Sequence, residues 1–285
     1  VILQIDSGEL HKNLDTAAFL WKSLLYHGAD RHAVLINLGG GVIGDLGGFC
    51  AATFMRGIRF IQIPTSLLAQ VDASVGGKLG VDLDHHKNMV GVFKQPDAVF
   101  IYTAFIKTLP YRQLQSGYAE MLKHHLIADK EAWLATKDMK DLTGLTEGDW
   151  IEKSIQIKNK VVGEDPEEKG RRKVLNFGHT IGHALESLLL SSDRPMTHGD
   201  AVAIGMVCES HLSYQLGHLT EEEVTEIRDH VLRIFGHKYK SIPSTEKIIA
   251  AMQFDKKNSN GIISFSLLDA IGCGSYNKTV TDQQI

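Results

Sequence analysis

A glycine-rich turn directly after a buried-type strand constrains the fold of this chain more than any other feature. Residues 33–38 (AVLINL) are mostly apolar, and Gly39, Gly40 and Gly41 end the run abruptly. With Gly44 the string GGGVIGD completes the pattern G-x-G-x-x-G, and residues 42–54 are expected to continue as a helix. Glycine lets phosphate groups approach the backbone N–H groups at a helix N-terminus. The turn therefore predicts a phosphate-binding unit of strand, turn and helix.

The usual dinucleotide-binding pattern is incomplete beyond this turn. It places an acidic residue about 20 positions after the glycines, at the end of the next strand, whereas residues 60–66 read FIQIPTS. The residues alone leave two interpretations open. One is a dinucleotide site with a different second half, and the other is a turn whose glycines only let the helix pack closely on the sheet.

The segments around the turn alternate between strand-like and helical patterns, which is typical of a parallel sheet covered by helices. Strands are expected at residues 1–5 and 60–63, and a helix at 14–26. After Pro110 amphipathic patterns predict helices at residues 113–125, 149–162, 179–190, 201–214 and 221–234, before a last strand at 262–268 and a glycine-rich tail. We therefore predict an α/β N-terminal domain with a Rossmann-like parallel sheet over residues 1–109 and an all-α C-terminal domain over residues 110–285.

The composition excludes several classes of function. The 285 residues carry 30 basic and 34 acidic side chains, a formal net charge of -4, whereas nucleic-acid-binding proteins usually show a basic excess. No apolar run approaches the ~18 residues of a membrane-spanning helix. The cysteines Cys50, Cys208 and Cys273 are odd in number and lack CxxC spacing, which favours a reducing compartment. We therefore expect a cytoplasmic protein without nucleic-acid or membrane partners.

A candidate metal site comes from three segments of the second part. His179 and His183 in the string HTIGH stand at i and i+4 and share one helix face, where two imidazoles converge. A zinc protease would carry a glutamate at Thr180, which argues against a protease. His198 begins another expected helix, and Glu120 lies in a third. One carboxylate and two imidazoles are typical of a catalytic metal site, although an HxxxH pair also arises by chance among 14 histidines.

Further polar residues are hard to explain by structure alone. Residues 70–78 (QVDASVGGK) form a small polar segment that we expect to be flexible. Each lysine taken singly is most simply a solvated charge, but together the cations would bind a substrate with phosphate and carboxylate groups. The set comprises Lys78, Lys87, Asn88, Lys123, Lys158, Glu168, Arg172, Asn176 and, in the string DKKN, Lys256.

Several strings now stand out together: GGGVIGDLGGF, MRGIRFIQIPTSLLAQVDASVGGK, KNMVG, SGYAEMLKH, NFGHTIGHALE, HGDAVAIGM and DKKN. In this order the chain resembles the 3-dehydroquinate synthase family of sugar-phosphate cyclases. The resemblance implies an NAD-binding N-terminal domain, a metal-binding C-terminal domain and a homodimer. It also implies conversion of 3-deoxy-D-arabino-heptulosonate 7-phosphate to 3-dehydroquinate and phosphate, a step of aromatic amino acid biosynthesis by the shikimate pathway. The steps would be transient oxidation by NAD, β-elimination of phosphate, reduction and intramolecular aldol cyclisation.

The resemblance also implies roles for individual residues. Glu120, His179 and His198 match ligands of Zn(II) or Co(II), whereas His183 matches a substrate contact. The NAD site corresponds to Glu9, Lys12, Gly39, Gly40, Gly41, Gly44, Asp45, Thr65, Ser66, Lys78 and Lys87. The site for the phosphorylated sugar acid corresponds to Asp72, Lys78, Asn88, Lys123, Lys158, Arg172, Asn176 and Lys256, with Glu168 near the reacting carbon and Arg56 reaching the neighbouring subunit's substrate.

The chain departs from the common family pattern at Leu79, Arg171 and Asp200, none of which is matched to the site. Members of the family normally carry a further strand-helix-strand portion before the segment that matches Val1, so we interpret the chain as incompletely represented. Three other functions stay open. Another sugar-phosphate cyclase would change parts of the substrate set, a metal-dependent polyol dehydrogenase would need fewer cations, and an inactive remnant would have a structural role.

Overall fold

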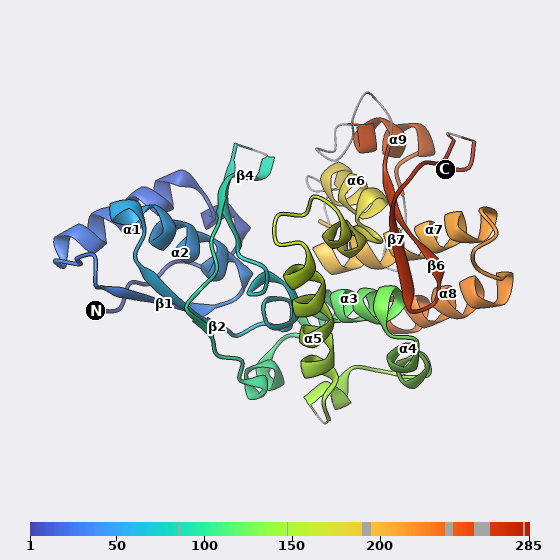
Figure 1. Cartoon of the computed structure of the whole chain (residues 1–285), viewed down its shortest axis with the longest axis horizontal. Coiled ribbons are helices and arrows are strands. Elements are labelled where there is room, and N and C mark those ends of the chain that lie inside the picture. The colour runs from blue at the N-terminus through green and yellow to red at the C-terminus, as the bar shows by residue number, and fades with distance from the viewer. Residues whose placement is uncertain (85, 147, 190–194, 237–241, 254–262, 282) are drawn as a thin grey trace. The chain divides into compact units, whose positions relative to one another are not determined.

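Strand β1 (Val34–Gly39) runs into the glycine turn, and helix α2 (Gly41–Thr53) begins at its end. β1 pairs in parallel with β2 (Arg59–Pro64), which pairs in parallel with the short β5 (Ala98–Val99), so the sheet order is β1-β2-β5 (Figure 1). The computed structural model describes residues 1–84, 86–146, 148–189, 195–236, 242–253, 263–281 and 283–285. These residues form two compact units, 1–113 and 114–285.

Helix α2 covers one face of the sheet at close range. Phe60 and Asn37, on β2 and β1, are buried. A Cβ on Gly47 would lie 2.0 Å from Asn37 Oδ1, and a Cβ on Gly48 would lie 2.4 Å from the side chain of Leu79. A larger residue at either position would therefore force Asn37 or Leu79 to move.

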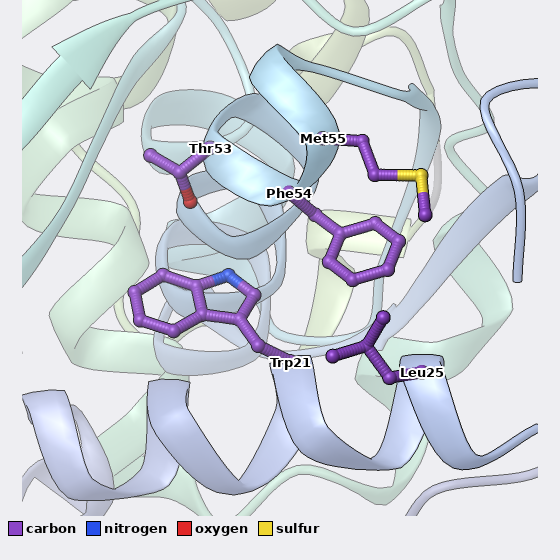
Figure 2. A pocket seen from close by; sticks show the side chains of 5 residues that line it. All are labelled: Trp21, Leu25, Thr53, Phe54 and Met55. Atoms are coloured by element: carbon purple, nitrogen blue, oxygen red, sulfur yellow. The ribbon is translucent and has the colours of Figure 1, made fainter.

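Helix α1 (Leu14–Tyr26) has the predicted bounds, because Asn13 caps its first turn by accepting a hydrogen bond from Thr16 N at 2.9 Å. Trp21 donates from Nε1 to the carbonyl of Cys50 on α2 at 3.2 Å. A hollow beside this contact (Figure 2) is lined by Trp21, Leu25, Thr53, Phe54 and Met55. Because this lining is mainly apolar and offers no acid, base or metal ligand, we do not regard the hollow as a catalytic site.

One prediction for this unit is wrong. Residues 1–5 form no strand: Val1 and Ile2 are 90% and 94% exposed, and among the described residues no strand pairs with this segment. A strand is stabilised by hydrogen bonds to a neighbour, so an apolar run without one stays irregular. The polar segment 70–78 begins within a π-helical turn, Ala69–Ala73, in which Gln70 is fully buried. The antiparallel hairpin of β3 (Lys78–Leu83) and β4 (His86–Phe93) follows.

The second unit is mainly helical. Helices α3 (Tyr111–Ala128), α5 (Trp150–Glu164), α6 (His179–Leu189), α7 (His198–Gln215) and α8 (Glu221–Phe235) correspond to the predicted helices, while α4 (Lys130–Thr136) and α9 (Thr245–Gln253) are additional. A Cβ on Gly205 of α7 would lie 1.9 Å from the carbonyl oxygen of Gly178, just before α6. Helices α6 and α7 therefore pack with their backbones close together. In the described part of the chain, no helix has the length and apolar character needed to cross a membrane.

The expectation of a purely helical C-terminal domain omits a small antiparallel sheet. Strands β6 (Phe265–Ala270) and β7 (Cys273–Lys278) pair with each other, and Leu267 and Leu268 of β6 are fully buried. The predicted glycine-rich tail is thus the second strand of a hairpin. Gly272 makes the reversal with a φ of 82°, which glycine adopts without strain.

Two buried histidines of the helical unit predict a pH-dependent stability. Burial lowers the pKa values of His125 and His230 to about 4, and His230 contacts Tyr118 Oη and the carbonyl of Lys137, each at 2.8 Å. Because histidine in an unfolded chain titrates near pH 6.5, the unfolded state binds more protons between about pH 6.5 and 4. The free energy of unfolding should therefore fall as the pH drops through this range, by about 1.4 kcal/mol per unit of pKa shift at most.

Urea unfolding at pH 7, 6 and 5 measures this dependence. A His230→Gln variant should be less stable at pH 7 and should lose less stability than the parent between pH 7 and 5. Equal losses in the two proteins would contradict the prediction.

Candidate metal centre and binding residues

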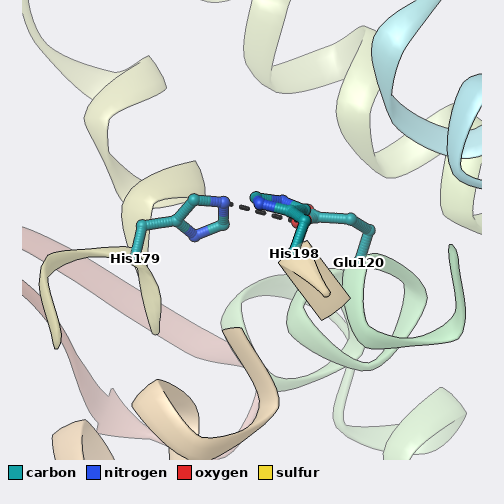
Figure 3. A group of neighbouring side chains, drawn as sticks. All are labelled: Glu120, His179 and His198. Atoms are coloured by element: carbon teal, nitrogen blue, oxygen red, sulfur yellow. Dashed lines mark hydrogen bonds and ion pairs between the residues drawn. The ribbon is translucent and has the colours of Figure 1, made fainter. Parts of the chain in front are cut away.

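Three side chains from three helices meet in the helical unit (Figure 3). Glu120 of α3 is fully buried, His179 is the first residue of α6, and His198 is the first residue of α7. Glu120 Oε1 lies 3.3 Å from His179 Nε2 and 3.1 Å from His198 Nε2. One ligand atom from each residue lies within 4.8 Å of the other two, which is the convergence that a shared metal ion needs.

These distances fit a tetrahedral metal ion. Zinc binds imidazole nitrogen and carboxylate oxygen at about 2.0–2.2 Å, so two ligand atoms at tetrahedral corners lie roughly 3.3–3.6 Å apart. The distances of 3.1 and 3.3 Å from Glu120 to the two histidines are close to this range. Three protein ligands leave a position open for substrate, as in catalytic zinc sites. The donor set thus fits Zn(II) or Co(II).

Burial and neighbouring charges shift the protonation of all three residues. Burial acts to raise the pKa of Glu120, but Lys123 and His179 hold that pKa well below its usual range. Burial lowers the pKa of His179 to about 3. Burial acts to lower the pKa of His198 too, but hydrogen bonds to Glu120 and Glu186 outweigh it and raise the pKa to about 10. A metal cation at this site would displace the proton between His198 and Glu120.

Further contacts orient the three side chains. His179 Nδ1 lies 3.1 Å from the carbonyl of Phe177, and His198 Nδ1 lies 3.3 Å from Glu186 Oε2. Lys123 donates a hydrogen bond to Glu120 Oε2, the oxygen that does not face the histidines. Sequence reasoning gave no role to Glu186. Its spacing from His179, two helical turns along α6, places both on one helix face and was the signal that could have identified it.

His183 lies beside the metal-ligand group. Its ring centroid is 5.1 Å from that of His179, with the ring planes at 89°, and 6.1 Å from that of His198. The converging ligand atoms belong to Glu120, His179 and His198. The i, i+4 spacing therefore brings two imidazoles together without making both of them members of this group.

The side chain of Asp165 stabilises the loop between α5 and α6. Asp165 accepts hydrogen bonds from the backbone N–H groups of Lys169, Gly170 and Arg172 at 3.0, 2.7 and 3.0 Å. The buried Arg172 donates from Nη1 to the carbonyl of Pro166 at 2.6 Å. Asp165, which sequence reasoning missed, thus closes the loop around the predicted binding residue Arg172.

The same loop joins two other predicted residues. Asn176 donates from Nδ2 to Glu168 Oε1 at 2.7 Å, and Glu168 has a φ of 59°. A left-handed backbone at a residue other than glycine is uncommon and clusters at binding sites. Lys158 of α5 is buried as well, whereas Lys256 lies outside the described residues.

Replacing Asp165 should therefore disturb the loop that carries the predicted binding residues Glu168, Arg172 and Asn176. In Asp165→Ala the three N–H donors lose their acceptor, and we expect kcat/KM to fall by about 10- to 100-fold because the side chains of the loop shift. Steady-state kinetics test this. Asp165→Asn keeps one acceptor oxygen and should lie between the parent and Asp165→Ala. Unchanged kinetics in both variants would show that the loop does not depend on Asp165.

The glycine turn lies at the carboxyl end of the parallel sheet. Gly40 is the N-cap of α2 and carries no capping side chain. A Cβ on Gly40 would lie 3.4 Å from Ser66 Oγ, and a Cβ on Gly41 would lie 3.5 Å from its nearest neighbour, both ordinary contacts, whereas a Cβ on Gly39 would clash with Ile43 at 2.6 Å. Packing thus explains Gly39 but not Gly40 or Gly41. This favours an approaching ligand over the interpretation of the turn as a packing device alone.

A buried lysine lies among carboxylates in the same unit. Lys12 Nζ is 2.6 Å from Glu9, 3.5 Å from Asp45 and 3.7 Å from Asp82. Burial acts to lower the pKa of Lys12, but Asp45 and Glu9 raise it. Burial raises the pKa of Asp45 to about 7, against the charge of Lys12. The structure therefore brings Glu9, Lys12 and Asp45 together, and adds Asp82, which sequence reasoning missed because the β3-β4 hairpin was not predicted.

The remaining predicted residues of this unit lie on loops and on the hairpin. Thr65 and Ser66 follow β2 as the glycine turn follows β1, and Thr65 N donates to the carbonyl of Gly39 at 2.8 Å. The others are Asp72 in the π-helical turn, Lys78 at the start of β3, Lys87 and Asn88 on β4, and Arg56 in the turn after α2.

Comparison with known proteins follows the same division of the chain. The model of the N-terminal domain of 3-dehydroquinate synthase matches residues 2–116, and that of its C-terminal domain matches residues 117–258. The 3-dehydroquinate synthase of Parabacteroides distasonis is 42% identical over 286 residues, which cover 100% of this chain and 81% of that protein. That of Bordetella pertussis is 43% identical, over 95% of this chain and 76% of the relative.

Solved structures with the same fold include other cyclases. A 2-epi-5-epi-valiolone synthase from Streptomyces hygroscopicus, solved with NAD+ and Zn2+, has a TM-score of 0.88 at 27% identity and covers 98% of this chain and 79% of its own. A 2-deoxy-scyllo-inosose synthase, solved with carbaglucose-6-phosphate, NAD+ and Co2+, has a TM-score of 0.85 at 28% identity. The match covers 98% of this chain and 78% of the synthase. The predicted fold class, a Rossmann-like α/β domain followed by a helical domain, is confirmed. Because two family models together match residues 2–258 and a relative is 42% identical over the whole of this chain, the chain belongs to the 3-dehydroquinate synthase family.

Proposed function

We propose that the protein catalyses the 3-dehydroquinate synthase reaction, the conversion of 3-deoxy-D-arabino-heptulosonate 7-phosphate to 3-dehydroquinate and phosphate. The observation that carries this proposal is the group of Glu120, His179 and His198, whose spacing fits a catalytic metal ion, in a chain of this family. The relatives with this name are about 42% identical over most of the chain. Because phosphate leaves by elimination, which breaks a carbon–oxygen bond, the enzyme would be a carbon-oxygen lyase. Its product belongs to aromatic amino acid biosynthesis.

We infer that NAD and Zn(II) or Co(II) are the cofactors, as in the solved cyclases. When bound, NAD would supply a reversible hydride acceptor, and the metal ion would supply polarisation of a substrate oxygen. Glu120, His179 and His198 would hold the metal. The α2 N-terminus at Gly40 and Gly41, with Ser66 beside it and the cluster of Glu9, Lys12 and Asp45, would hold the dinucleotide, since backbone N–H groups at a helix start bind phosphate.

The substrate would be held mainly by cations and amides. Arg172 and Lys158 are charged groups that suit the carboxylate, and the pair of Asn176 and Glu168 at 2.7 Å presents a donor and an acceptor to hydroxyl groups. Lys123 lies against Glu120 and would stabilise negative charge that develops next to the metal. The other proposed contacts are Asp72, Lys78, Lys87, Asn88, His183 and Lys256. We also propose a cytoplasmic homodimer in which Arg56 reaches the neighbouring subunit's substrate, and the free cysteines fit a reducing compartment.

One assay tests the function. The protein is incubated with the heptulosonate phosphate, NAD and Zn(II), and phosphate release, 3-dehydroquinate and NADH are followed together. We expect phosphate and dehydroquinate in equal amounts without accumulation of NADH, because the hydride returns to the intermediate. Steady NADH accumulation would instead identify a dehydrogenase, and turnover of a different sugar phosphate to a different carbocycle would identify another cyclase. No turnover with any of these substrates would overturn the enzyme proposal.

A further inference from the structure

One carboxylate lies on each side of the His198 imidazole ring. Its Nε2 faces Glu120 Oε1 at 3.1 Å, and its Nδ1 faces Glu186 Oε2 at 3.3 Å. Glu120 is one of the proposed metal ligands, whereas Glu186 lies on the opposite side of the His198 ring. The side chain of Glu186 is only 11% exposed. A carboxylate that is so nearly buried is costly unless it accepts hydrogen bonds, so its place against Nδ1 calls for an explanation.

The position of the imidazole proton supplies that explanation. An imidazole binds a metal through a nitrogen without a proton, and the other nitrogen then carries the N–H. A carboxylate accepts only, so Glu186 favours the form of His198 with its proton on Nδ1. Without Glu186 the neutral ring could keep its single proton on Nε2 and donate it to Glu120 instead. That form blocks the nitrogen that faces the metal site and occupies the carboxylate oxygen as well.

His179 has the same arrangement, with a backbone carbonyl in place of the carboxylate of Glu186. Its Nδ1 lies 3.1 Å from the carbonyl of Phe177, which also accepts only, and its Nε2 faces Glu120 Oε1 at 3.3 Å. Both imidazoles therefore direct Nε2 to the same carboxylate oxygen and Nδ1 to an acceptor. Helix α6 supplies His179 as one ligand and, two turns later on the same face, Glu186 as the support of the other.

We propose that Glu186 is a positioning residue for the metal site, which fixes the orientation and the proton of His198 so that Nε2 binds the metal ion. This inference rests on the proposed function, because it takes Glu120, His179 and His198 as the ligands. It assigns Glu186 no contact with the metal ion, the dinucleotide or the substrate. Partners of this kind typically change metal affinity by about 10- to 100-fold when they are removed.

Metal binding by the purified apoprotein tests the proposal without using activity. Zn(II) affinity is measured by competition with a chromogenic chelator, and the visible absorption spectrum of the Co(II) form reports the ligand geometry. In Glu186→Met, which has a similar length but no acceptor, we expect Zn(II) affinity to fall about 10- to 100-fold and the Co(II) spectrum to change. In Glu186→Gln the amide oxygen still accepts from Nδ1, and the loss should be clearly smaller.

Glu209 of α7 provides a matched control. It is a fully buried carboxylate that supports α6 by accepting from the backbone N–H groups of Gly178 and Ile181 at 2.6 and 3.1 Å, whereas Glu186 faces the ring of His198. Glu209→Gln should lower the melting temperature of the apoprotein while its Zn(II) affinity changes less than in Glu186→Met. Unchanged Zn(II) affinity in Glu186→Met, or an equal loss in Glu186→Met and Glu209→Gln, would overturn the proposal. If the parent protein itself bound no metal at Glu120, His179 and His198, the ligand assignment would fail instead.

Discussion

Replacing His179 with alanine should abolish tight metal binding and turnover together, whereas replacing His183 with alanine should leave the metal bound and impair turnover alone. His179 Nε2 is one of three converging ligand atoms, 3.3 Å from Glu120 Oε1, and a site with three protein ligands loses most of its affinity with one of them. The His183 ring contacts His179 from the side, at 5.1 Å between centroids. Because His183 is proposed as a substrate contact, its loss should lower turnover by roughly 100-fold through poorer positioning of the substrate.

Equilibrium dialysis with Zn(II), followed by metal analysis and the dehydroquinate assay, separates the two variants. The parent and His183→Ala should each retain one metal ion per chain, and His179→Ala should retain none. His211, on α7 and outside the ligand group, serves as a control, and His211→Ala should keep both metal and turnover. Metal loss from His183→Ala would show that the two histidines of the HTIGH string have been assigned the wrong way round.

Local patterns predicted the helices well because their signals are contained in the helices themselves. Asn13 caps α1 by bonding Thr16 N at 2.9 Å, and Thr220 with Glu223 forms a capping box at the start of α8. Both helices begin where the sequence placed them. The position of the glycine turn was also predicted, because the glycines end an apolar run and precede a helical pattern.

Features that depend on distant partners were not predictable from one segment. Residues 1–5 have the composition of a strand, but strand formation requires a neighbour, and none pairs with them among the described residues. The β3-β4 hairpin was not predicted because the need for its glycines arises from the partner strand. Gly80 pairs with Gly91, and a Cβ on Gly91 would lie 2.4 Å from the carbonyl of Leu79. Such a requirement appears only when both strands are in place.

The same distinction applies to the metal site. The histidine spacing and a lone glutamate indicated the group of Glu120, His179 and His198, because ligand types are few and their chemistry is specific. The supporting residues Glu186 and Asp165 were missed because a carboxylate that accepts hydrogen bonds looks like any other charged residue until its donors are known. Only the folded loop shows that Asp165 binds three N–H groups.

The start of α6 carries His179, the start of α7 carries His198, and the two helices pack closely because glycines lie at their contact, Gly205 among them. A Cβ on Gly205 would lie 1.9 Å from the carbonyl oxygen of Gly178, which is backbone and has no flexible end to move aside. Gly205→Ala should therefore push the two helices apart. We expect it to destabilise the protein by about 3 kcal/mol or more, which for a domain of this size lowers the melting temperature by roughly 6–12 °C. It should also weaken Zn(II) binding, because the two histidines no longer converge on Glu120.

Thermal unfolding of the apoprotein and Zn(II) affinity, measured on the same samples, test both parts of this expectation. Gly163, near the end of α5, provides the matched control because a Cβ there meets nothing within 4 Å. Gly163→Ala should be neutral or stabilising by up to about 1 kcal/mol, since alanine restricts the unfolded chain more than glycine does, and its Zn(II) affinity should match that of the parent. If Gly205→Ala were as stable as Gly163→Ala, the helices would have room that the structure does not show. If Gly205→Ala lost stability but bound Zn(II) as tightly as the parent, the convergence of the histidines would not depend on the spacing of α6 and α7.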